Sequence, residues 1–170
     1  NWVLGPGTFR GREGILLMNS AVSAVIGGEF EWHYSIGTEG IYYNGLSFSG
    51  PDGSGDVYYS PAQISLPFDL DTGESVASSS QQVTCYDGVG CEGDENSLFT
   101  TTVDISVKLE SQEQITVPAG TFTTYHMLTE TTTTTIFKLT GQVDESYFFT
   151  EEWLAECVGP VKSVSWDPDD

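Results

Sequence analysis

The chain has 170 residues, of which 38% are hydrophobic and 12% aromatic, and this composition excludes a chain that is disordered throughout. Its 25 acidic residues against five basic ones give a formal net charge of −20, which repels nucleic acid and anionic membrane surfaces. The length suits one compact unit, and we predict a single β domain over residues 1–170.

The N-terminal part of the chain carries an apolar stretch from Ile15 to Ile26, behind Arg10 and Arg12. This order faintly resembles an export signal, but polar residues such as Ser20 interrupt it, and it is too short to cross a bilayer. We predict a buried strand or one short N-terminal helix here, and no transmembrane segment. We expect that an export signal has been removed upstream of the chain.

The first clear strand is marked by aromatic residues at every second position of the segment Phe30–Tyr34. The next apolar residues, 41–48, are divided by Asn44 and Gly45. An Asn-Gly pair between apolar runs is typical of a tight hairpin turn. A bulge within one continuous strand is the other interpretation, and the sequence leaves both open.

The middle of the chain is rich in turn residues. Residues 51–56 carry the glycine and aspartate residues of a turn. Residues 64–68 alternate as a strand does, but Pro61 and Pro67 restrict them to an edge strand or a connection. The polar residues 74–84 are predicted to be extended.

The chain has three cysteines, and two of them are close in sequence. Five residues separate Cys85 from Cys91, and Gly88 and Gly90 allow this loop to close tightly. We predict a Cys85–Cys91 disulfide, which would stabilise the fold by about 2–3 kcal/mol in an oxidising compartment. Two free thiols in a reducing cell are the alternative. Cys157 is left either buried and inert or available for an intermolecular bridge.

The second half of the chain reads as β structure throughout. Apolar residues alternate with polar ones from Val103 to Leu109, which predicts a half-buried strand. A turn at residues 118–120 precedes a long threonine-rich strand that extends to Leu139, because β-branched residues favour sheets. Residues 147–155 and 161–166 form the last two strands. About ten strands predict an all-β fold: an antiparallel sandwich, a barrel or a strongly curved sheet.

Two segments of the second half carry a resemblance to a known family. Residues 116–122 read TVPAGTF, and residues 153–162 read WLAECVGPVK. Residues 59–61, 66–68 and 71–75 add three shorter matches upstream. In this order the segments resemble the DUF3108-like and LolA/LolB-like bacterial exported proteins, which are uncharacterised periplasmic proteins and lipoproteins.

The resemblance covers about residues 30–166 and implies a fold. The expected architecture is a strongly curved antiparallel sheet, half-barrel or barrel-like, that wraps an apolar interior and sometimes holds a lipid-like ligand. The resemblance supplies no catalytic residues. Glu156 and Cys157 stand where the family pattern has Pro-Gly, so the local turn departs from the pattern.

The first functional hypothesis is a non-enzymatic extracytoplasmic domain, either periplasmic, displayed at the cell surface or secreted. Its partner would be a hydrophobic small molecule in a concave apolar interior, or a protein. The residues predicted to form the ligand-facing wall are aromatic: Phe30, Trp32, Tyr34, Phe122 and Trp153.

The second hypothesis is a structural or adhesive surface module stabilised by Ca²⁺ and the predicted disulfide. Two acidic, glycine-containing loops offer carboxylate oxygens to a hard cation. Neither has the spacing of an EF-hand, and a solvated acidic turn is the competing interpretation. The predicted metal-ligating residues are Asp52 and Asp56 in the first loop and Asp87, Glu92 and Asp94 in the second.

Few features of the sequence support the third hypothesis, that the protein is a hydrolase. No G-x-S-x-G nucleophile elbow is present, and a Ser-His-Asp triad would have to use His33 or His126. Both histidines lie on predicted strands, and we expect each of them to point outward or to be hydrogen-bonded without a catalytic role. Paired carboxylates are frequent because the chain is so acidic. We therefore predict that the protein is not an enzyme and assign no catalytic residue.

Overall fold

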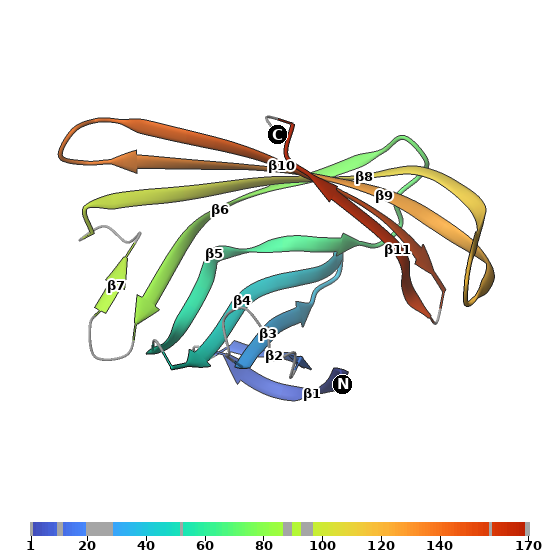
Figure 1. The fold of residues 1–170 in the computed structure, drawn as a ribbon, viewed down its shortest axis with the longest axis horizontal. Helices are drawn as coiled ribbons and strands as arrows, with labels where there is room; N and C mark the ends of the chain where they lie inside the picture. Colours follow the sequence, from blue (N-terminus) through green and yellow to red (C-terminus); the bar gives the residue numbers. More distant parts are fainter. Residues whose placement is uncertain are drawn as a thin grey trace.

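The computed structural model describes residues 2–9, 12–19, 29–51, 53–86, 90–92, 97–156 and 158–168. These residues form eleven strands in one antiparallel sheet (Figure 1). The sheet follows the order of the chain, except that β7 pairs only with β6 and lies off the main path. The strands are β1 (Trp2–Phe9), β2 (Arg12–Asn19), β3 (Glu29–Ile36), β4 (Gly40–Gly50), β5 (Gly53–Pro67), β6 (Ser75–Tyr86), β7 (Gly90–Glu92), β8 (Phe99–Val117), β9 (Gly120–Phe137), β10 (Val143–Ala155) and β11 (Gly159–Trp166).

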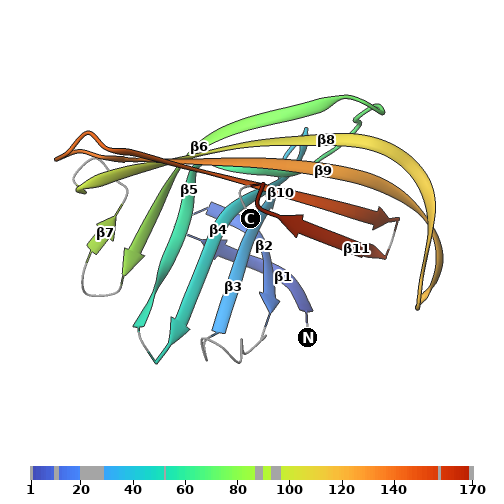
Figure 2. The ribbon, with the colours of Figure 1, turned by 45° about the horizontal axis from the view of Figure 1, so that its top comes forward.

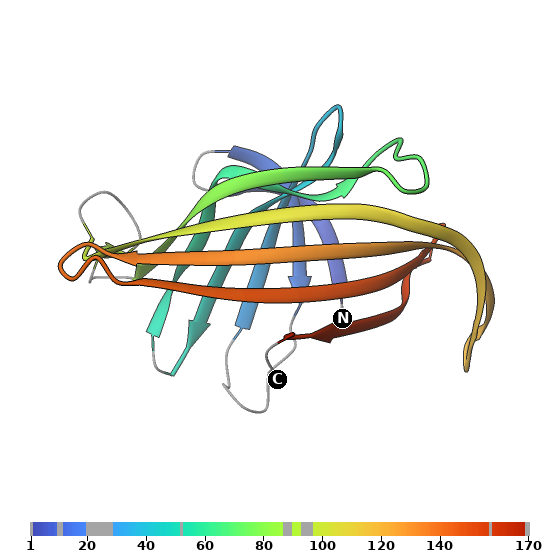
Figure 3. The same ribbon diagram turned by 90° about the horizontal axis from the view of Figure 1, so that it is seen from above.

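The sheet curls into a half-barrel, as the sequence predicted. The long strands β6, β8, β9 and β10 lie side by side, and β1–β5 curve away beneath them (Figures 1 and 3). Figure 2 shows β3, β4 and β5 running at a steep angle to the long strands. The inner side of this curve is called the concave face below, and the outer side the convex face.

The N-terminal apolar stretch is a strand as far as the structure describes it. Strand β2 covers Arg12–Asn19 and pairs with β1 on one side and β3 on the other. Pairing on both sides satisfies its backbone groups without a helix. Of the two alternatives predicted for this stretch, a strand or a short helix, the strand is confirmed for residues 12–19, and residues 20–28 lie outside the described part. Within that part, no helix is long and apolar enough to cross a membrane.

Asn44 and Gly45 form a bulge and not a hairpin turn. Strand β4 runs through them without a break, and its register with β5 shifts between Tyr43 and Gly45. Gly45 has a φ of +145°, and a Cβ atom there would lie 2.1 Å from the Val57 carbonyl oxygen. Only glycine fits this close approach of two backbones. Bulges bend and twist a strand, so this one contributes to the curl of the sheet.

Strand β5 changes character at Pro61. Its residues from Gly55 to Ser60 pair with β6. Residues 63–67 pair with β4 and have no ladder partner among the described residues of β6, so that side of the segment is an unpaired edge within the sheet. The restriction predicted from the two prolines is confirmed. The Ile64 N–H donates to the Ser78 hydroxyl at 3.2 Å, which satisfies one backbone group that the missing ladder leaves open.

The hydrophobic core lies on the concave face. Ile64 of β5 packs against Val107 and Leu109 of β8 and Met127 of β9, all at most 6% exposed. Tyr42, Leu70, Val76, Ile105 and Leu154 pack around this cluster. The core therefore joins the lower strands β4 and β5 to the upper strands β8–β10.

The predicted disulfide is present between Cys85 of β6 and Cys91 of β7. The two residues face each other in the antiparallel ladder. The bond fixes the short strand β7 to the sheet. Cys157 lies outside the described residues.

Candidate functional site

A cavity lies on the concave face at one end of the half-barrel. It has a volume of about 660 Å³, which falls within the range of small-molecule sites. The end of β5, the loop of residues 68–74 and the strands β8–β11 enclose it. Most of its lining is apolar: Leu66, Pro67, Asp69, Leu70, Leu109, Tyr125, Met127, Leu154, Ala155, Glu156, Gly159 and Pro160.

The loop of residues 68–74 is held in place by backbone hydrogen bonds at both ends. The Phe68 N–H donates to the Glu39 carbonyl at 2.8 Å, and the Gly73 N–H donates to the Leu109 carbonyl at 2.7 Å. The Leu109 N–H in turn donates to the Glu74 carbonyl at 3.1 Å. These bonds fix the side of the cavity that Leu70 contributes.

The other side of the cavity is formed by three neighbouring strands. Leu109 of β8 faces Met127 of β9, and Tyr125 of β9 faces Leu154 of β10. Paired residues in a sheet point to the same face, so these four side chains share the concave face. Beyond them, Ala155 pairs with Gly159, whose φ of +93° turns the chain into β11.

All charged residues in the described lining of the cavity are acidic. Asp69 and Glu156 contribute to the lining directly. Glu152 lies beside it on the concave face, because it pairs with Met127 and precedes Leu154 by two residues. Burial raises the pKa of the Glu152 carboxyl above its usual value.

A row of tyrosines continues the concave face beyond Glu152. The Tyr34 and Tyr43 rings lie 5.2 Å apart between centroids, and the Tyr43 and Tyr59 rings 5.4 Å apart. Burial raises the pKa of all three phenols, and the nearby Glu152 carboxylate adds to the shift at Tyr34. The phenols therefore stay protonated and able to donate hydrogen bonds.

Two buried polar side chains near this row have no hydrogen-bond partner among the described residues. They are the Gln63 amide nitrogen and the Ser80 hydroxyl, each in a residue that is 2% exposed. Buried polar groups are normally paired, so this part of the interior has unused hydrogen-bonding capacity.

The structure brings together three of the five residues predicted to form a ligand-facing wall. Phe30, Trp32 and Tyr34 lie on the concave face of β3, where the Phe30 and Trp32 rings are 5.9 Å apart. Trp153 lies on the opposite face, because its neighbour Leu154 faces the cavity. Phe122 lies there too, because it is three residues before Tyr125 in β9 and successive side chains of a strand alternate between faces. None of the five is among the described residues that line the cavity.

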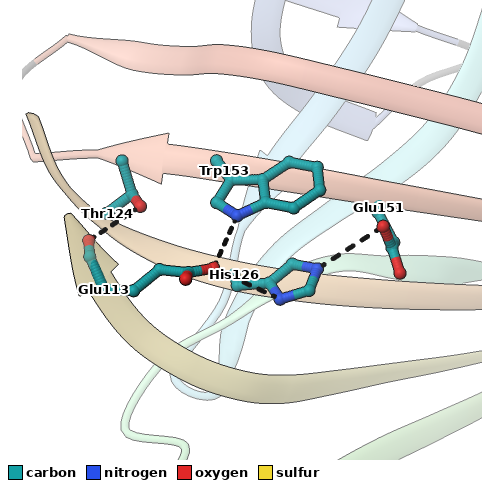
Figure 4. Close-up of polar contacts among 5 residues, drawn as sticks. All are labelled: Glu113, Thr124, His126, Glu151 and Trp153. Carbon is teal, nitrogen blue, oxygen red and sulfur yellow. Dashed lines mark hydrogen bonds and ion pairs between the residues drawn. The ribbon is translucent and has the colours of Figure 1, made fainter. Parts of the chain in front are cut away.

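Trp153 belongs to a polar cluster on the convex face (Figure 4). It is 6% exposed, it stacks on His126 with ring centroids 4.3 Å apart, and its indole N–H donates to Glu113 Oε1 at 2.8 Å. The Lys162 ammonium covers its ring at 3.6 Å. His126 lies between Glu113 and Glu151, at 3.7 and 3.8 Å, which is longer than a hydrogen bond. This cluster packs the convex face.

The predicted calcium ligands are only partly described. Asp52, Asp87 and Asp94 lie outside the described residues. Asp56 accepts a hydrogen bond from the Ser47 hydroxyl at 2.8 Å, and Glu92 is exposed on β7. The described part of the chain contains no group of three or more side chains that could hold a metal ion.

His33 forms a hydrogen-bonded chain with Ser47 and Asp56 on the convex face. The Ser47 hydroxyl donates to Asp56 and lies 3.1 Å from His33 Nε2. In a catalytic triad the histidine stands between the serine and the carboxylate, whereas here the serine stands between the other two. Because Ser47 gives its proton to Asp56, it accepts from His33 and is not activated by it. His33 is 4% exposed, and burial lowers its pKa.

The profile of a family described as DUF3108-like matches residues 54–170. The chain belongs to the DUF3108-like family. All the described residues that line the cavity fall within the matched segment, as does Glu152, whereas Tyr34 and Tyr43 precede it. No curated protein matches the DUF3108-like chain, and no solved structure matches it.

Proposed function

We propose that this DUF3108-like protein is a non-enzymatic extracytoplasmic domain that binds a hydrophobic small molecule in the concave cavity. The observation that carries the proposal is the cavity itself, with its volume of about 660 Å³ and its largely apolar lining. Apolar surface that stays open to water in a folded protein is usually covered by a ligand or a partner.

The arrangement of the site supports binding over catalysis. The lining side chains come from the sheet and from a loop tied to β8 by two hydrogen bonds, so the site is formed before a ligand enters. The described lining contains no serine, cysteine, histidine or lysine, and its two carboxylates, Asp69 and Glu156, belong to exposed residues. The Cys85–Cys91 disulfide fits the oxidising environment of an exported protein. The likeness to LolA/LolB-like exported proteins stays a prediction.

The proposal is tested by uptake of the neutral dye Nile red, whose fluorescence rises in apolar surroundings. The variant Leu154→Arg places a charge in the cavity, and Leu139→Arg makes the same change at an 81% exposed position in the β9–β10 turn. We expect L154R to bind the dye about tenfold more weakly than wild type and L139R to bind it equally well.

Equal binding by both variants would show that the dye does not enter the cavity. Far-ultraviolet circular dichroism checks that L154R is folded, and the milder change Leu70→Gln replaces it if it is not. Native mass spectrometry of gently purified protein is the second readout. An adduct that wild type retains and L154R loses supports the proposal. If neither wild type nor L139R binds the dye, the proposal is contradicted.

A further inference from the structure

The cavity has an electrostatic character that restricts which hydrophobic molecules it can hold. Resting on the proposed function, we propose that the cavity selects amphiphiles whose polar end is cationic, such as alkylammonium compounds, and discriminates against fatty acids and other anionic amphiphiles.

The acidic groups at this site come from two parts of the chain. Asp69 lies in the loop after β5, whereas Glu152 lies near the end of β10 and Glu156 directly follows that strand. Asp69 holds a left-handed φ of +57°, which fixes its position in the loop and is uncommon for a residue other than glycine. Glu152 is joined to the lining through its pairing with Met127.

The described basic side chains are engaged away from the cavity. Lys108 forms an ion pair with Glu110 at 2.8 Å, and Lys162 covers Trp153 on the convex face. Lys138 lies in the turn that connects β9 to β10. No lysine or arginine is among the described residues that line the cavity, so nothing described there compensates the carboxylates.

The sign of the discrimination follows from desolvation and from Coulomb's law. An anionic end group would lose water and meet carboxylates of like charge, and both effects weaken its binding. A cationic end group would lose the same water but pair with those carboxylates. The Tyr125 ring in the lining offers a further contact to a cation through its π face. An apolar chain would occupy the remaining lining in either case.

The net charge of −20 attracts cations to the whole surface. The experiment must therefore separate the attraction by the whole protein from the attraction by the carboxylates at the cavity. Three amphiphiles with ten-carbon chains serve as probes: decyltrimethylammonium and decanoate, each below its critical micelle concentration, and decanol below its solubility limit. Each displaces Nile red from the protein at neutral pH and physiological salt. We expect decyltrimethylammonium to act at a concentration about tenfold or more below that of decanoate, with decanol between them.

Two triple variants remove the same amount of charge from different places. D69N/E152Q/E156Q neutralises the cavity, and E29Q/D144N/E145Q makes the same three types of change at exposed acids outside the described cavities. We expect the preference for the cation to fall at least about fivefold in the first variant and to persist in the second. Asparagine tolerates the left-handed φ of Asp69, and glutamine matches the shape of glutamate, so the first variant should fold.

The outcomes separate this inference from the function on which it rests. Equal loss of preference in both triple variants, or decanoate as potent as the cation in wild type, overturns the charge selection while hydrophobic binding stands. Failure of wild type to bind Nile red, decanol and the cation alike overturns the proposed function itself. Loss of preference in the cavity variant alone supports the inference.

Discussion

Replacing Thr124 with valine tests whether the curled end of the β8–β9 hairpin is held by a single buried hydroxyl. Thr124 is fully buried, and its Oγ1 donates to the Glu113 carbonyl at 3.0 Å across the hairpin (Figure 4). The bond lies just beyond a register shift between Leu109 and Ser111, where the ladder is irregular. Tyr125, the next residue, lines the cavity, so the bond also positions the site.

The expected loss of stability follows from the burial of the Thr124 hydroxyl, which is the hydrogen-bond donor. Valine has nearly the shape of threonine, so Thr124→Val removes the hydrogen bond and leaves the packing almost unchanged. A net intramolecular hydrogen bond contributes about 1 kcal/mol, and a carbonyl that loses its donor adds to the loss. We expect the free energy of unfolding to fall by about 1–2 kcal/mol, which lowers Tm by about 2–8 °C in a domain of this size.

The assay is urea unfolding followed by circular dichroism, with the slope m compared between variants. The matched control is Thr123→Val at the neighbouring exposed position, which should change the stability by less than about 0.5 kcal/mol. A Thr124→Val variant as stable as wild type, at unchanged m, would refute the claim that this bond holds the hairpin end.

Three further predictions concern other parts of the sheet. Gly45→Ala should lower the free energy of unfolding by about 3 kcal/mol or more, because the new Cβ atom would lie 2.1 Å from the Val57 carbonyl oxygen. Urea unfolding measures this loss, and a near-neutral result would mean that the bulge is not built as described. Replacing Cys85 and Cys91 with serine should cost about 2–3 kcal/mol, and reducing agent should destabilise wild type but not this variant. Burial raises the pKa of the Glu152 carboxyl in the folded state above 4.5, so wild type should lose stability as the pH rises from 4.5 through the folded-state pKa. The variant Glu152→Gln should lack this loss. Parallel profiles of stability against pH for the two proteins would contradict the burial of Glu152.

The sequence predicted the fold well because its strongest signals are local. Alternation from Val103 to Leu109 places those side chains on the buried face of β8, and the turn at residues 118–120 starts β9 where expected. The threonine run lies within β9, as β-branched residues favour. The edge character of residues 61–67 also followed from the two prolines alone.

The candidate site could not be predicted in the same way, because it depends on the register between distant strands. Leu66, Leu109 and Leu154 meet at the cavity although more than 40 residues separate each from the next along the chain. Phe122 and Trp153 are aromatic, as Tyr34 is, so the residue type does not show which face each occupies. The pairings of β9 and β10 place Phe122 and Trp153 on the convex face. A bulge adds one residue to one strand, so it changes which face the later residues occupy, and the position of such bulges is not visible in the apolar pattern.

The order of the sheet has a consequence for how the chain reaches its folded state. Each strand on the main path pairs with the one that precedes it in the chain, and the single step from β6 to β8 passes over only the short β7. Loop-closure entropy grows with the number of residues enclosed, so every pairing here encloses few residues for an all-β protein. Each hairpin can therefore serve as the template for the next, and the sheet can grow from strand to strand while the chain is still emerging, without a late pairing between its two ends.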